Sequence, residues 1–66
     1  MARVRRGGYI LTWFAGDHEP RHVHVVTDKG KLLGRFDLRT RRGVEGWQPA
    51  RKLLQVIEQL EREGRL

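Results

Sequence analysis

The sequence contains no cysteine and no long hydrophobic run. Without cysteine, neither disulfide bonds nor a zinc site built on thiolates can stabilise the fold. No segment reaches the roughly 18 apolar residues that a membrane-spanning helix requires, and residues 1–8 lack the apolar core of a secretory signal. We therefore expect a cytoplasmic protein that depends on a packed core, or on a partner that covers it.

At 66 residues the chain is near the lower size limit for one self-supporting core, so we expect a single domain over residues 1–66. A homo-oligomer or a heterocomplex is a serious alternative to a monomer at this size. The formal net charge is +6, with arginine as the main source. Guanidinium groups suit phosphates and carboxylates, so the expected partner is a nucleic acid or an acidic protein.

Three segments have the composition of β-strands. Residues 9–15 are rich in aromatic and β-branched side chains between glycines, and residues 22–27 and 31–38 follow them. The sequence Asp28-Lys29-Gly30 predicts a tight hairpin turn with Gly30, or Lys29 beside it, at positive φ. Residues 1–8 contain three arginines and are interpreted as a flexible basic arm.

The last third of the chain predicts one amphipathic helix over about residues 49–63. Apolar residues recur there at the i, i+3, i+4, i+7 spacing, at Ala50, Leu53, Leu54, Ile57 and Leu60. Pro49 is expected in the first turn and Gly64 at the end. The predicted fold is therefore α+β, with a three-stranded antiparallel sheet and the helix packed on one face.

Side-chain alternation assigns the two faces of this sheet. The face beneath the helix is expected to carry Val23, Val25, Leu32, Phe36 and Leu38, with Gly34 in the gap. The open face is expected to carry His22, His24, Val26, Lys31, Leu33 and Arg35.

All three histidines fall in the run Asp17-His18-Glu19-Pro20-Arg21-His22-Val23-His24-Val25. His22 and His24 can share a metal ion with His18 or Asp17, or can serve in metal-independent RNA cleavage, for which His18 is a further catalytic candidate. In the latter case one imidazole removes the 2′-hydroxyl proton, another protonates the leaving oxygen, and Arg35 or Arg21 stabilises the phosphorane. We favour a third interpretation, in which the histidines form structural hydrogen bonds, and we rank acid–base catalysis above metal binding.

Residues 39–46 are expected to form a basic loop. This loop and the start of the helix form a second candidate site, a basic cluster around Trp47. Its cations are Arg39, Arg41, Arg42, Arg51 and Lys52. Cations at a helix N-terminus oppose the helix dipole, and acids crowd the other end at Glu58, Glu61 and Glu63, so a bound phosphate would compensate the first imbalance. Trp47 can stack on a base, although we favour a role in fixing the loop to the core.

The pattern Gly8-Tyr9, an aromatic strand, Asp17-His18-x-Pro20-x-His22-x-His24-Val25 and a later helix resembles the bacterial family DUF4160, domain of unknown function forty-one-sixty. The similarity runs from about Gly8 to Glu63. The sequence departs from the pattern at Arg21, where a second proline is expected, and in ending soon after its helix. The resemblance implies a small protein of a toxin–antitoxin-like module, often encoded beside a second small protein, with no settled reaction.

These observations favour a binding module of a toxin–antitoxin-like pair over an enzyme. Its expected partner is RNA or DNA, or a small acidic protein encoded nearby, with no membrane, metal or cofactor involved. The first alternative is a metal-independent ribonuclease toxin that uses His22 and His24. The second is a structural module that forms a dimer through its open sheet face.

Overall fold

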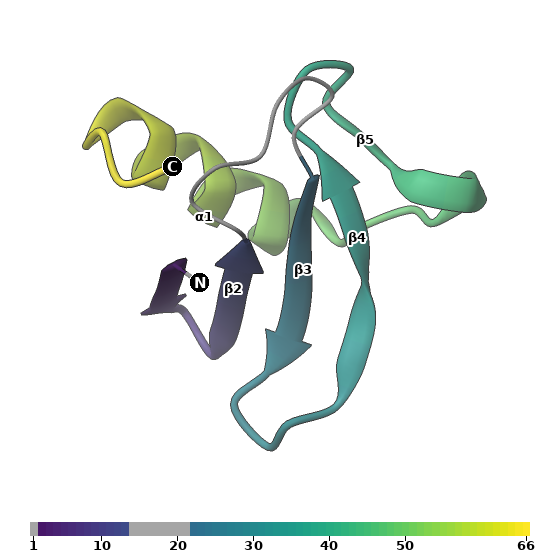
Figure 1. Cartoon of the computed structure of the whole chain (residues 1–66), viewed down its shortest axis with the longest axis horizontal. Helices are drawn as coiled ribbons and strands as arrows, with labels where there is room; N and C mark the ends of the chain where they lie inside the picture. The colour runs from purple at the N-terminus through teal and green to yellow at the C-terminus, as the bar shows by residue number, and fades with distance from the viewer. Residues whose placement is uncertain (1, 14–21) are drawn as a thin grey trace.

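A computed structural model of the chain describes residues 2–13 and 22–66 and shows a five-stranded antiparallel sheet with one helix on one face (Figure 1). The strands lie in the sheet in the same order as in the sequence. The elements are β1 Ala2–Arg6, β2 Tyr9–Trp13, β3 His22–Thr27, β4 Leu32–Asp37, β5 Arg42–Gly43, a 3-10 turn η1 Val44–Gly46, and α1 Arg51–Arg62.

The predicted three-stranded sheet is wrong, because both flanking segments add a strand. The expected flexible arm forms β1, which pairs with β2 from Ala2 opposite Trp13 to Arg6 opposite Tyr9. Gly7 and Gly8 join the two strands at φ values of 63° and 83°. A two-residue turn with positive φ at both positions matches the twist of a β-hairpin. The α+β class of the prediction is retained.

The fifth strand lies where a basic loop was expected. Arg42 in β5 is the register partner of Asp37 at the end of β4. The carboxylate of Asp37 closes the connecting turn, because its Oδ1 accepts hydrogen bonds from the backbone N–H groups of Arg39 (2.8 Å) and Thr40 (3.2 Å). Arg41 completes the turn in the left-handed region at φ 60°.

The hydrophobic core lies between the sheet and α1. The sheet contributes Val4, Leu11, Trp13, Val23, Val25 and Phe36, and the helix contributes Leu53, Val56, Ile57 and Leu60. The inward orientation of Val23 and Val25 is confirmed, because both are fully buried while His24 between them is exposed. The predicted helix face lacked Val56, which is buried, and included Ala50, which is exposed.

Strict alternation fails in β4. The pairing with β3 shifts between the pair Val25–Gly34 and the pair Val26–Leu32, so Leu33 is an extra residue in a bulge. Leu32, which was predicted to face the helix, is 61% exposed on the open face. Leu33, which was predicted to face outward, packs against the core instead.

The helix begins two residues later than predicted. Because Ala50 is its N-cap, Pro49 precedes the cap and does not lie in the first turn. Ala50 makes no side-chain capping hydrogen bond. The C-terminal prediction is confirmed, since Gly64 has φ 73° and the N–H of Arg65 donates to the carbonyl of Leu60 at 2.9 Å. In the part of the chain that the structure describes, no helix has the length and apolarity to cross a bilayer.

Because the bulge exposes Leu32, its loss should cost much less stability than the loss of a buried leucine. Replacing Leu32 with alanine is expected to change the free energy of unfolding by less than about 0.5 kcal/mol, because its side chain lies in solvent. The matched variant Leu11→Ala empties a fully buried position and is expected to cost about 2–5 kcal/mol. Urea denaturation of both variants measures the difference, and equal costs would show that Leu32 faces the core after all.

Candidate functional site

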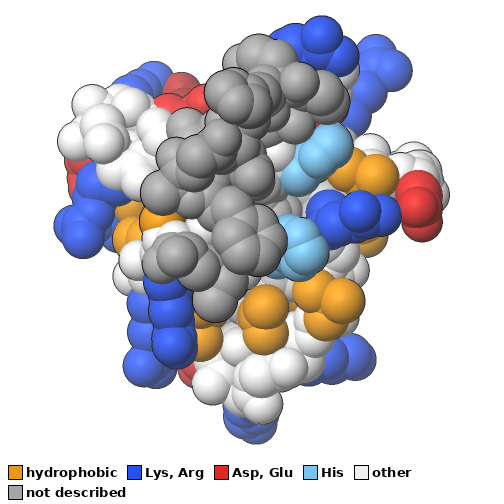
Figure 2. All heavy atoms as spheres, viewed as in Figure 1, with side chains coloured by type: hydrophobic (Ala, Val, Ile, Leu, Met, Phe, Trp, Pro, Cys, Tyr) orange, Lys and Arg blue, Asp and Glu red, His pale blue; other side chains and the backbone are white. Residues whose placement is uncertain are grey.

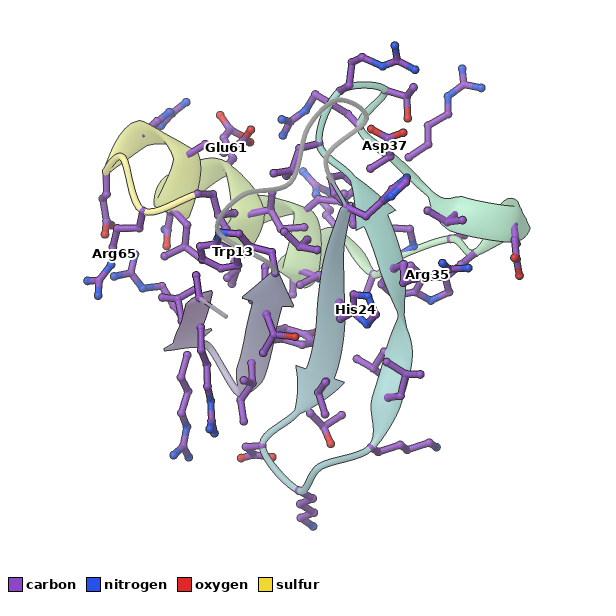
Figure 3. All side chains as sticks on the ribbon, viewed as in Figure 1. Trp13, His24, Arg35, Asp37, Glu61 and Arg65 are labelled. Atoms are coloured by element: carbon purple, nitrogen blue, oxygen red, sulfur yellow. The ribbon has the colours of Figure 1, made fainter. Side chains whose placement is uncertain are left out.

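The sheet face opposite α1 carries both described histidines (Figure 2). His24 on β3 is the register partner of Arg35 on β4 and of Thr12 on β2, and Thr12 is in turn opposite Arg3 on β1. Figure 3 shows the side chains of His24 and Arg35 next to each other in front of the sheet. The predicted placement of the two histidines and Arg35 on one open face is therefore confirmed.

His22 lies at the end of this face, beside the carboxylate that closes the β4–β5 turn. Its Nε2 atom is 3.6 Å from Oδ2 of Asp37, an ion-pair distance when the ring is protonated. Burial alone would raise the pKa of Asp37, but it is outweighed by hydrogen bonds from the N–H groups of Arg39 and Thr40 and by the nearby charges of His22 and Arg39. The net effect is a pKa below the ordinary value, so the carboxylate that faces His22 stays ionised.

Metal binding at the histidines, the alternative that the sequence analysis ranked last, stays untested. Among residues 2–13 and 22–66, no three histidine, cysteine, aspartate or glutamate side chains come together as a metal site. His22 and His24 supply two imidazoles from one strand face. His18 and Asp17, which were expected to provide further ligands, lie outside the described residues.

The predicted basic cluster is divided between two places. Arg39, Arg41 and Arg42 lie together at the β4–β5 turn, whereas Arg51 and Lys52 begin α1. Arg41 turns toward the helix, where its Nη1 atom is 2.6 Å from Oε1 of Glu61. Lys52 extends toward the β1–β2 turn, since its Cε atom lies 3.9 Å from the position that a Cβ on Gly7 would occupy.

Trp47 packs directly on the backbone of two strands. An atom of its indole ring lies 2.5 Å from the position of a Cβ on Gly34, and its carbonyl oxygen lies 1.8 Å from that of a Cβ on Gly43. Neither strand position has room for a side chain. Trp47 is half-buried and contacts the core, as the favoured interpretation expected, and stacking on a base stays a prediction.

The acidic end of α1 is neutralised from within the chain. Three arginine–carboxylate pairs account for it, namely Arg62–Glu58, Arg41–Glu61 and Arg6–Glu63. The hydrogen bond from Arg6 lowers the pKa of Glu63, against the effect of burial, and raises the pKa of Arg6. At the opposite end, Arg51 and Lys52 make no ion pair with any carboxylate that the structure describes.

Beside β4, the open face is hollowed into a groove of about 570 Å³. Its charged side is formed by His24 and Arg35, and its apolar side by Leu32, Val44 and Trp47. Glu45 stands at the rim, with its Oε1 atom 3.1 Å from Nη2 of Arg35. Glu45 also has φ 59°, a left-handed conformation that is uncommon for a residue other than glycine.

Sequence reasoning found only part of this groove. It named His24, Arg35 and Trp47, but it placed Leu32 on the wrong face and treated residues 44–46 as part of a longer basic loop. The signal that was available is the pair Gly43 and Gly46, which brackets Val44 and Glu45 and indicates a tight turn.

The pKa of Asp37 predicts a pH-dependent contribution to stability. A carboxylate whose pKa is lower in the folded state stabilises the fold above its unfolded pKa and loses this contribution as the pH falls through the folded pKa. The difference in unfolding free energy between the wild type and Asp37→Asn is therefore expected to shrink on acidification from about pH 7 to about pH 2. Asp28→Asn, which removes a charge from an exposed turn, is the control. A constant difference for Asp37→Asn would contradict the assignment.

Comparison with known proteins identifies the family but no reaction. No curated protein and no solved structure matches the chain. The model of one family, described as domain of unknown function (DUF4160), matches residues 8–65. This match covers nearly the whole chain, including β2, the histidine strand, the groove and the helix. The chain therefore belongs to the DUF4160 family.

Proposed function

We propose that this protein binds nucleic acid through the arginines of its open sheet face and its β4–β5 turn. The observation that supports this most strongly is the separation of paired from unpaired cations. The acids of α1 are taken up by three arginines, as described above. The cations on or beside the open face that make no ion pair with a described carboxylate include Arg3, Arg5, Arg39 and Arg42.

These unpaired arginines are well placed to contact a phosphate backbone. The ladder puts Arg3 and Arg5 on the same face as His24, and Arg42 extends that face beyond β4. Binding of such cations to phosphates releases condensed counterions, which favours association at low salt. A guanidinium group also forms two parallel hydrogen bonds to one phosphate, which lysine cannot do.

The same surface suits a small acidic protein, which is the partner that a toxin–antitoxin-like pair implies. A partner of this kind would cover the unpaired arginines and compete with nucleic acid for them. We include this regulation in the proposal because the resemblance noted in the sequence implies a two-protein module. Co-expression with the neighbouring reading frame, followed by a competition assay with RNA, tests it. A partner that binds without displacing RNA would contradict competition.

A second candidate function is metal-independent RNA cleavage. The observation in its favour is the placement of two imidazoles on one open face, with His24 exposed beside Arg35 and His22 beside the ionised Asp37. A carboxylate next to an imidazole can fix the orientation of the ring, as proton transfer to a leaving oxygen requires. Arg35 would stabilise charge on the phosphorane.

The binding proposal predicts a strong and residue-specific dependence on salt. Arg39→Gln and Arg42→Gln are each expected to weaken RNA or DNA binding and to reduce the slope of log K against log salt by about 1. Arg62→Gln is the matched control, because Arg62 lies on α1 and already pairs with Glu58. Fluorescence anisotropy at several salt concentrations measures the slopes. Equal slopes for all three variants, or no binding by the wild type, would refute the proposal.

The cleavage hypothesis predicts loss of activity on removal of either imidazole. Purified protein is expected to cut single-stranded RNA in the presence of a chelator, and His22→Ala and His24→Ala are each expected to reduce the rate by about 100-fold or more. Thr12→Ala, a change beside His24 that removes no titratable group, is the control. Intact RNA after incubation with the wild type would exclude this function.

A further inference from the structure

We infer that the groove beside β4 binds one unpaired nucleotide and that Glu45 occupies its phosphate position in the free protein. The phosphate would lie on Arg35 and His24, and the base would lie against Leu32 and Trp47. This inference rests on the proposed nucleic-acid binding and narrows it to single-stranded segments, since a base inside a duplex cannot reach an apolar wall.

The phosphate position is defined by two side chains that the ladder holds together. His24 and Arg35 are direct cross-strand partners, and such pairs have Cβ atoms about 4.5–5.5 Å apart. Both side chains are exposed on the groove side of the sheet. An imidazole and a guanidinium at this separation can donate hydrogen bonds to different oxygens of one phosphate.

The base position is defined by apolar surface that the bulge in β4 brings outward. Among the residues that the structure describes, Leu32 is a large hydrophobic residue whose side chain is exposed. It lines the same groove as Val44 and the half-buried Trp47. An acidic peptide would bind the cationic side of the groove but would leave its apolar side chains exposed to water. A nucleotide combines an anion with a flat apolar ring, and bases stack readily on such surfaces. The groove therefore fits a nucleotide better than an acidic peptide.

Glu45 already shows that Arg35 accepts an anion at this place. Its carboxylate contacts the guanidinium at 3.1 Å, although its own side chain is 80% exposed. Exposed ion pairs contribute little to stability, so a phosphate can displace this carboxylate readily. The backbone of Glu45 is left-handed, a conformation that carries an energetic cost in a residue other than glycine and that recurs at functional sites.

The test removes the charge of Glu45 without removing its size. Glu45→Gln is expected to raise the affinity for a single-stranded oligouridylate, or for its DNA counterpart, by roughly 2- to 5-fold at constant salt. Glu58→Gln is the matched control, because it removes the same charge from another exposed arginine pair on α1. Leu32→Ser is expected to weaken single-strand binding. Neither Glu45→Gln nor Leu32→Ser is expected to alter the binding of a duplex of equal length beyond the change seen with Glu58→Gln.

A double-mutant cycle isolates the contact between Glu45 and Arg35. In an Arg35→Gln background, Glu45→Gln is expected to give no more gain than Glu58→Gln. The inference is overturned if Glu45→Gln and Glu58→Gln act alike in the wild type, if the extra gain persists without Arg35, or if single strand and duplex respond equally. Salt-dependent binding that still requires Arg39 and Arg42 would then leave the proposed function standing. Absence of binding to any nucleic acid would remove both.

Discussion

Val23 and Val25 are sealed between the sheet and α1, and this burial determines where the chemistry of the chain can be. Successive residues of a strand point to opposite faces, so His22 and His24 must project away from the helix. A slip of one residue would bury both imidazoles and expose both valines. Burial of a valine side chain contributes about 1.5–3 kcal/mol, and an unpaired polar group in its place carries a penalty of about 1–3 kcal/mol, so the register is strongly specified.

The distribution of arginines follows from the same layering. Arg6 and Arg41 reach the helix from β1 and from the β4–β5 turn, where they meet Glu63 and Glu61. Exposed pairs of this kind contribute only about 0–1 kcal/mol each. Their larger effect is on where positive charge stays unpaired. Carboxylates that are already paired with Arg6 and Arg41 are not available to pair with the arginines of the open face. The open face is thereby left with an excess of arginine.

The sequence allowed the correct prediction of the helix, the β3–β4 hairpin and the inward valines, because each has a strong periodic or turn signal. The β1–β2 hairpin was missed because residues 1–8 were interpreted as a flexible basic arm, so that Gly7-Gly8 was not considered as a two-residue turn. Leu32 was misplaced because a bulge is a property of strand pairing that one strand's pattern does not reveal. Glu45 was missed for a related reason, since its contact with Arg35 depends on how η1 folds back along β4.

We propose that the sheet face carrying the imidazoles, and not the helix face, is the binding surface. Amide chemical-shift mapping during titration with a single-stranded oligonucleotide tests this most directly. We expect the largest shifts along the row formed by Arg3, Thr12, His24 and Arg35 and at the β4–β5 turn, with small shifts along the exposed side of α1. Shifts concentrated on α1, with the histidine strand unaffected, would contradict it.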